Sequence, residues 1–324
     1  MEYKLRREDV RYNVWCLHIE MAFLKVIGNW LEGSGWTALI SESNVATVGT
    51  AESFLKATNI KRTRRAHQVT ACALFTLLHK AHTQYEGENE NGTLPLEEWC
   101  NTQKSIIPQF QYWLTVLHLE NLLLLFIKSL RCADFKLYVS VLHKMLPWFF
   151  TTNHPNYARW LSVHLRDMCT LEETVPDVAS AFKKGLFTVS KTRRLFSAIA
   201  IDQAHEQNNA IVKGEGGAVG LTENPSALRR WMLSGPEIAR LVNEFQEIMY
   251  SDTSTESIPH HETEKGFQIT FYKDVKALMT TLEEIGNPFL EETQDLFVLD
   301  TKVVADKSSV EAMQNSESKG ETTV

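Results

Sequence analysis

Apolar side chains recur every three to four residues along most of the chain, a spacing that puts them on one face of an α-helix. From Trp15 to Leu31 this spacing aligns Ile19, Phe23 and Trp30, and a glycine pair beginning at Gly33 ends the pattern. The same pattern predicts further helices over residues 62–85, 108–131, 134–146, 156–168, 176–185, 202–213, 225–233, 236–250 and 271–285. We expect the helix that begins at 134 to stop before Pro147.

The pattern changes between residues 186 and 201. Leu186–Val189 and Leu195–Ile201 are short and rich in branched and aromatic side chains, which are typical of strands. The sequence therefore predicts a mainly α-helical fold with a small β-hairpin, or two short strands, near residues 186–201.

A polar stretch near the C-terminus suggests how the chain is divided. Residues 251–264 are rich in Ser, Thr, His and Glu and have no apolar period, which is typical of a linker. We therefore predict a main helical domain over 1–250 and a small C-terminal helical part over 265–306. The polar residues 307–324 are expected to form a disordered tail.

Composition sets limits on the class of protein. The chain has 324 residues, of which 44% are hydrophobic, so it can bury a substantial core. Its formal net charge of −7 argues against a protein that coats nucleic acid without specificity, but it leaves room for a local basic groove.

Cysteine usage and hydropathy predict an intracellular location, nuclear or cytoplasmic. The five cysteines are scattered and contain no CxxC pair, which indicates reduced thiols. The first residues lack the apolar core of a secretion signal. The most apolar segment, Tyr112–Leu130, is interrupted by Glu120 and Lys128, so we expect a buried core helix and no membrane span.

Four polar residues after the second predicted strand form the densest group of chemical side chains. Asp202, His205, Glu206 and Asn209 have the spacing i, i+3, i+4 and i+7, which places them on one face of a helix. Two carboxylates, an imidazole and an amide can bind a divalent metal, with Asp202 and Glu206 as ligands, or move protons. The alternative is a solvated helix face that Asp202 caps.

Basic residues gather at several points of the sequence. The cluster from Lys61 to Arg65 lies at the start of a predicted helix, where the helix dipole disfavours positive charge, so phosphate or acidic neighbours should offset it. The glycine-rich residues 214–220 follow a predicted helix instead of a strand, which is the wrong context for a dinucleotide loop. If a nucleic-acid surface exists, we expect it to consist of Lys61, Arg62, Arg64, Arg65, Arg193, Arg194, Arg229 and Arg230.

Four stretches resemble a widespread group of uncharacterised, transposon-associated proteins of invertebrate genomes. They are LHIEMAFLKVIGNWLEGSGW, GTAESFLKATNIKRTRRAHQVT, NHPNYARWLSVHLRDM and FSAIAIDQAHEQNNAIVKGEGGAVGLTENPSALRRWM, and the similarity covers roughly residues 10 to 310. That group is in turn similar to RNase H-like DDE transposases with a helical insertion. The resemblance implies two aspartates and a late glutamate that hold two Mg²⁺ ions and direct water or a 3′-hydroxyl at a DNA phosphodiester.

The match to the transposase pattern is partial. Asp202 and His205 fit a short pattern of Asp, two residues, then His, and Glu206 is the nearest following acid. The strands that carry the first two aspartates would precede residue 10, where Asp9 lies in a charged run. The resemblance therefore implies a transposase-derived fragment without phosphoryl-transfer activity of its own, in which Mg²⁺ binds only if further sequence completes the site, and in which weak DNA binding persists.

Two other functions are compatible with the sequence. The acidic net charge favours a helical protein–protein interaction scaffold with no nucleic-acid role. A metal-dependent hydrolase centred on Asp202, His205 and Glu206 is the third hypothesis.

Overall fold

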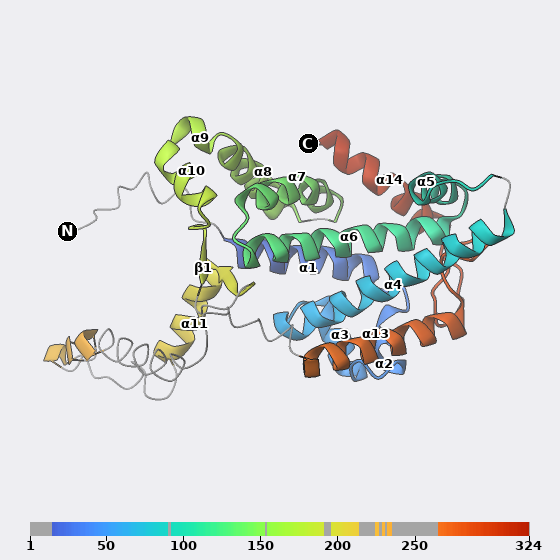
Figure 1. Cartoon of the computed structure of the whole chain (residues 1–324), viewed down its shortest axis with the longest axis horizontal. Coiled ribbons are helices and arrows are strands. Elements are labelled where there is room, and N and C mark those ends of the chain that lie inside the picture. The colour runs from blue at the N-terminus through green and yellow to red at the C-terminus, as the bar shows by residue number, and fades with distance from the viewer. Residues whose placement is uncertain are drawn as a thin grey trace.

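The computed structural model describes residues 15–89, 92–152, 154–190, 196–213, 265–323 and the short pieces 224–226, 229–230 and 232–234. Within these residues the chain is mostly helical and forms one two-stranded antiparallel sheet (Figure 1). The prediction of a mainly α fold with a small β element is confirmed.

The helices succeed one another along the chain with short connections. The elements before the sheet are α1 (Cys16–Leu31), α2 (Trp36–Glu42), α3 (Val48–Leu55), α4 (Ile60–Glu88), α5 (Leu96–Ile106), α6 (Pro108–Arg131), α7 (Phe135–Thr151), α8 (Pro155–Cys169), α9 (Leu171–Thr174) and α10 (Pro176–Lys183). The sheet consists of β1 (Thr188–Ser190) and β2 (Ala198–Ala200), and the elements after it are α11 (Ile201–Lys213), α13 (Lys265–Ile285) and α14 (Lys307–Thr323).

Helix α6 lies at the centre of the molecule and contacts α1, α4, α5 and α7 (Figure 1). It is apolar around most of its circumference because helices cover it on several sides, and Trp113 and Phe126 are fully buried. Among the described residues it is also the one helix long and apolar enough to cross a membrane, yet most of its apolar stretch is buried inside the protein. The expectation that this segment is a core helix agrees with the structure.

Helices α1 and α3 approach closely at Gly28. A methyl group added at Gly28 would meet the backbone oxygen of Leu55 at 2.2 Å, so only a residue without a Cβ fits there. This contact brings the end of α3 against α1, and α4 begins a few residues later.

The C-terminal elements pack onto the same core as the rest of the chain. Helix α13 lies along α4 and contacts α2, and it buries Val275, Leu278 and Leu282 in the common hydrophobic cluster (Figure 1). The predicted small part over 265–306 therefore shares its core with the main domain. The linker predicted at 251–264 lies outside the described residues.

The prediction of a disordered tail is wrong. Residues 307–323 form α14, which packs against α7 and buries Met313. Asp306 starts this helix, because its carboxylate accepts hydrogen bonds from the backbone N–H and the hydroxyl of Ser309. The segment 307–323 is polar in composition, but one face of the helix it forms is covered by α7.

Helix α7 runs through Pro147 and ends at Thr151, so the predicted stop before this proline is also wrong. Proline in a helix costs roughly 3 kcal/mol. Trp148 and Phe149 lie in the hydrophobic core, and burying two aromatic side chains offsets that cost.

The hairpin positions the start of α11. Thr188 pairs with Ala200 and Ser190 with Ala198, and α11 begins at the residue after β2. Strand β2 contacts α6, while α11 contacts α1. The sheet therefore anchors the first turn of α11 beside α1 and α6.

Candidate functional site

Asp202, the acid at the start of the predicted metal-binding face, caps a different helix. Its carboxylate accepts hydrogen bonds from the backbone N–H groups of Leu17 (2.9 Å) and His18 (3.2 Å), in the first turn of α1. It also accepts from His18 Nδ1 at 2.9 Å and from the N–H of Gln203 at 3.0 Å. The N-terminus of α1 has no side-chain cap of its own. Asp202 supplies that cap from a distance of 185 residues in sequence.

The other members of this face extend into solvent. His205 and Glu206 are exposed and Asn209 is half-buried on α11, so the predicted helix and its shared face are present. Within the described part of the chain, no group of three His, Cys, Asp or Glu side chains is arranged to hold a metal ion. The basic residues Lys191 and Arg194, which precede this face in the sequence, lie outside the described residues.

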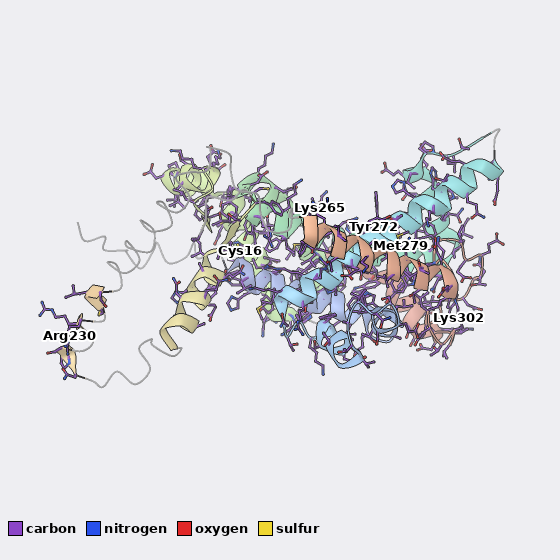
Figure 2. All side chains as sticks on the ribbon, turned by 60° about the horizontal axis from the view of Figure 1, so that its bottom comes forward. Cys16, Arg230, Lys265, Tyr272, Met279 and Lys302 are labelled. Carbon is purple, nitrogen blue, oxygen red and sulfur yellow. The ribbon has the colours of Figure 1, made fainter. Side chains whose placement is uncertain are left out.

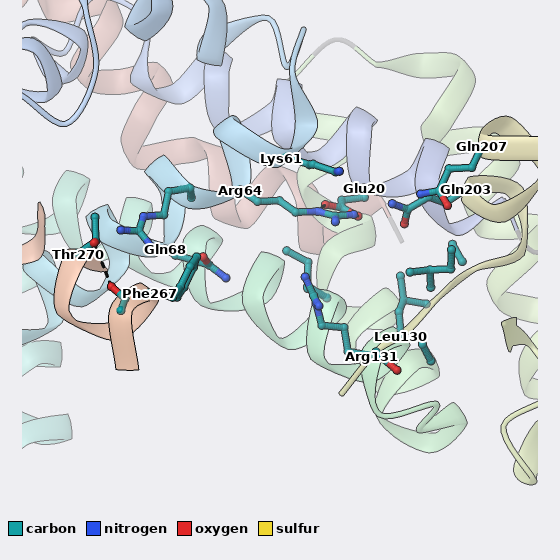
Figure 3. Close-up of a pocket in the computed structure, with 17 residues that line it drawn as sticks. Glu20, Lys61, Arg64, Gln68, Leu130, Arg131, Gln203, Gln207, Phe267 and Thr270 are labelled. Carbon is teal, nitrogen blue, oxygen red and sulfur yellow. Dashed lines mark hydrogen bonds and ion pairs between the residues drawn. The ribbon is translucent and has the colours of Figure 1, made fainter. Parts of the chain in front are cut away.

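A recess of about 720 Å³ lies on the neighbouring face of α11, among α4, α6, β2 and the first turn of α13 (Figure 3). The elements that form it are far apart in the sequence and meet through the contacts of α13 with α4 and of β2 with α6 and α11. Its lining comprises Glu20, Lys61, Arg64, Arg65, Gln68, Ile127, Leu130, Arg131, Ser197, Ala198, Ile199, Ala200, Gln203, Gln207, Gly266, Phe267 and Thr270.

Three of the cations in the lining come from the first turns of α4, and two of these already have acidic partners. Arg64 makes a bidentate contact with Glu20, whose side chain is fully buried. Arg65 donates to Asp274 at 2.7 Å and lies over the ring of Phe267. Acidic neighbours therefore offset two of the four positive charges at the start of α4, which was one of the explanations that the sequence left open.

Lys61 is the cation with the most freedom. It is exposed at the edge of the recess, and no acidic side chain of the described residues pairs with it. Figure 3 shows its side chain extending into the space between α4 and α11. Its ammonium group is available to a ligand at little cost, because no existing ion pair must be broken.

Arg131, the fourth cation, stands at the end of α6 and is held by Phe196. Its guanidinium donates to the Phe196 carbonyl at 3.4 Å and lies 5.4 Å from the centre of the Phe196 ring. Phe196 has a φ of +59°, a conformation that is uncommon for a bulky side chain and is often kept where a site requires it. Sequence reasoning missed Arg131, whose only signal is its place in the last turn of an apolar helix.

The remaining walls are amide and apolar. Gln203 and Gln207 lie four residues apart on α11 and face the recess, and Gln68 lines it from α4 (Figure 3). Ile127 and Leu130 of α6 form the floor together with β2. The site residues predicted from the sequence lie on the adjacent face of α11, because the spacing of polar residues along this helix does not indicate which polar face lines a recess.

The other predicted basic side chains that the structure describes do not line this recess. Arg62 is exposed and does not line the recess. Arg229 and Arg230 are exposed, and Figure 2 shows Arg230 well apart from Lys265, which adjoins the recess. Arg193 and Arg194 lie outside the described residues, as does the glycine-rich segment 214–220.

A buried polar group lies behind the N-terminus of α1. The hydroxyl of Tyr138 is 2.9 Å from Nε2 of His164, and both side chains are buried. Burial lowers the pKa of His164 to about 4, against an attraction to Asp167 that acts in the other direction. Burial also raises the pKa of the Cys16 thiol well above its usual value, so this cysteine stays protonated.

Residues 90–324 match the model of a protein family described as a domain of unknown function (DUF8702). The chain belongs to this family. No curated protein matches the chain. No solved structure matches it either. The matched region contains α6, the hairpin, α11 and α13, whereas α4 and its three cations precede it.

Proposed function

We propose that this protein binds a nucleic-acid strand through phosphate contacts in the recess, and that it acts by binding and not by phosphoryl transfer. The observation that carries the proposal is the convergence of Lys61, Arg64, Arg65 and Arg131 on one concave site. In this proposal the chain is transposase-derived and works in the nucleus, and the Asp202 face contributes to stability instead of metal chemistry.

The electrostatics of the recess support an anionic ligand. Its lining has four cationic side chains, of which Arg64 pairs with the carboxylate of Glu20 and Arg65 with that of Asp274, so these two acids offset two of the four positive charges. The whole chain carries a net charge of −7, so the recess is a local positive site on an acidic protein. Such a site concentrates field lines and selects where an anion binds, while the acidic remainder repels nucleic acid elsewhere.

Arginine and lysine have different roles in this site. Buried Glu20 fixes Arg64 through its Nε and Nη2 donors, and Phe196 fixes Arg131, so both guanidinium groups have set positions and reach phosphate oxygens through their remaining donors. Lys61 is a point charge on a flexible stem and can adapt to the ligand. Because only a few phosphates fit beside these groups, we expect weak binding, on the order of 10⁻⁴ to 10⁻⁶ M at physiological salt.

A titration of labelled oligonucleotides with matched charge variants tests the proposal. We expect binding that weakens as salt rises from about 50 to about 200 mM, because phosphate contacts release counterions. Lys61→Gln and Arg131→Gln should each reduce the salt slope by about one and weaken binding to unrelated sequences alike. Arg62→Gln removes the same charge one residue from Lys61 but outside the recess, and it should leave binding nearly unchanged.

Two results would contradict the proposal. One is equal loss of binding in Arg62→Gln and Lys61→Gln, which would show a diffuse charge effect instead of a site. The other is the absence of binding at tens of micromolar protein and low salt, which would favour the helical interaction scaffold. Lys61 is exposed, so its replacement should not disturb folding and the comparison remains valid if Arg131→Gln is unstable.

A further inference from the structure

We infer that the recess takes one unpaired nucleotide, with its phosphate at Lys61 and Arg131 and its base against the amide and apolar walls. The protein would then prefer single-stranded nucleic acid to duplex. This inference rests on the proposed function and adds to it the kind of strand and the part of the strand that is recognised.

The shape of the site is the first argument. A recess of about 720 Å³ has the size of a pocket that encloses a small ligand. The phosphates of a duplex lie on the outside of a convex cylinder, with the bases stacked behind them. A base and its phosphate can enter a concave site together only if the base has left the stack or was never paired.

The division of the lining into two chemical parts is the second argument. Lys61 and Arg64 approach from α4, and Arg131 approaches from the last turn of α6, beside Leu130 (Figure 3). Ile127 and Leu130, which are nearly buried, form an apolar floor next to β2. A phosphate group alone makes no favourable contact with an apolar floor. A nucleotide joins an anionic group to a flat apolar ring system and satisfies both parts of the lining at once.

The glutamines are the third argument. Gln203 and Gln207 lie one turn apart on α11, and Figure 3 shows both side chains at the end of the recess that faces Arg64. An amide offers a donor and an acceptor side by side, and this pair matches the edge of a nucleobase. Phosphate oxygens only accept hydrogen bonds, so they cannot pair with the carbonyl oxygens of these amides. A base has N–H groups that can donate to those oxygens.

Fixed cations at the recess favour stacking as well as charge pairing. Arg64 is held by buried Glu20, and Arg131 is held by the carbonyl and ring of Phe196 in its left-handed conformation. A planar guanidinium whose position is already fixed presents a face on which a base can stack at a small entropic cost. The site is thus pre-organised for a flat ligand that carries an anion.

The test uses the full chain and three labelled probes of equal length: a single strand, the same sequence as a duplex, and a strand in which every base is removed. We expect the single strand to bind about tenfold more tightly than the abasic strand, which is the usual effect of one stacked base. The duplex should bind no better than the abasic strand. The variant Gln203→Ala/Gln207→Ala should weaken binding of the single strand and leave the abasic strand unchanged.

Asn208→Ala is the matched control, because Asn208 follows Gln207 directly on α11 but is exposed and outside the recess. It should not alter binding of any probe. Equal binding of all three probes, still lost in Lys61→Gln, would overturn the inference and leave the proposed function standing. Tighter binding of the duplex would also overturn it. Absence of binding by every probe would overturn both.

Discussion

Replacing Asp202 by alanine tests whether this residue is a structural cap or part of a metal site. The change removes a carboxylate that accepts hydrogen bonds from three backbone N–H groups and from the His18 ring. Leu17 and His18, in the first turn of α1, would then have unpaired backbone N–H groups in a partly buried position. The Asp202 side chain is only 10% exposed, so water can replace these hydrogen bonds incompletely.

The expected cost follows from these contacts. Loss of an N-terminal cap typically costs about 1 kcal/mol, and a hydrogen bond to a charged acceptor is worth about 1.5 to 3 kcal/mol. We therefore expect Asp202→Ala to lower the free energy of unfolding by about 2 to 3 kcal/mol. For a large domain this corresponds to a fall in Tm of about 4 to 6 °C. Asp202→Asn keeps one acceptor oxygen and should show roughly half of the effect.

Thermal and urea unfolding of Asp202→Ala, Asp202→Asn and Glu206→Ala would measure this effect. Glu206 is the control because it lies on the same face of α11 but is exposed, so its replacement should change stability by no more than about 0.5 kcal/mol. Equal losses for Asp202→Ala and Glu206→Ala would refute the capping argument. A Tm that rises with Mg²⁺ in the parent protein but in neither variant would instead establish the metal site that the sequence suggested.

Two further predictions concern the core. Gly28→Ala should lower the free energy of unfolding in urea by about 3 kcal/mol or more, because the added methyl group would overlap the Leu55 backbone. Gly49 lies on α3 with open space around it, so Gly49→Ala should raise the free energy of unfolding by about 0.5 to 1 kcal/mol. Equal effects of the two variants would contradict the close contact of α1 and α3. The pKa of His164 in the folded protein is about 4, below its ordinary value of 6.5. The stability that the buried neutral imidazole contributes is therefore fully present above pH 6.5 and is lost as the pH falls towards 4. Between these values the parent protein should lose on the order of 3 kcal/mol more stability than His164→Gln, and parallel pH profiles of the two would show that His164 is not held neutral.

Within the described residues the sequence predicted the long helices well because their apolar period is local, whereas the helix predicted over 236–250 and most of the one predicted over 225–233 lie outside those residues. The long helices, the hairpin and the start of α11 at residue 201 all follow from neighbouring residues. The stop before Pro147 and the disordered tail were wrong because contacts with distant parts of the chain decide both. Core burial of Trp148 and Phe149 holds the last turn of α7, and packing against α7 orders the polar helix α14.

The candidate site was predicted in part for the same reason. Lys61, Arg64 and Arg65 lie within five residues, so the sequence alone shows them as a basic cluster. Their position at a helix N-terminus, where the helix dipole disfavours positive charge, also predicts acidic partners. Arg131 and Gln203 join them only through tertiary packing, which no local pattern records. The role of Asp202 depends on Leu17, 185 residues away, so its sequence neighbours suggested a metal ligand instead.

The recess is lined both by residues of the family-matched region and by residues that precede it. Residues 90–324 supply the apolar floor, the glutamines and Arg131, whereas α4 supplies Lys61, Arg64 and Arg65 from outside that region. A recombinant protein trimmed to the matched residues would expose the faces of α6 that α1 and α4 cover, and it would lose three of the four cations. The set of side chains that lines the recess therefore depends on both parts of the chain, and exchanging the first 89 residues would change the recess without altering any residue of the family domain.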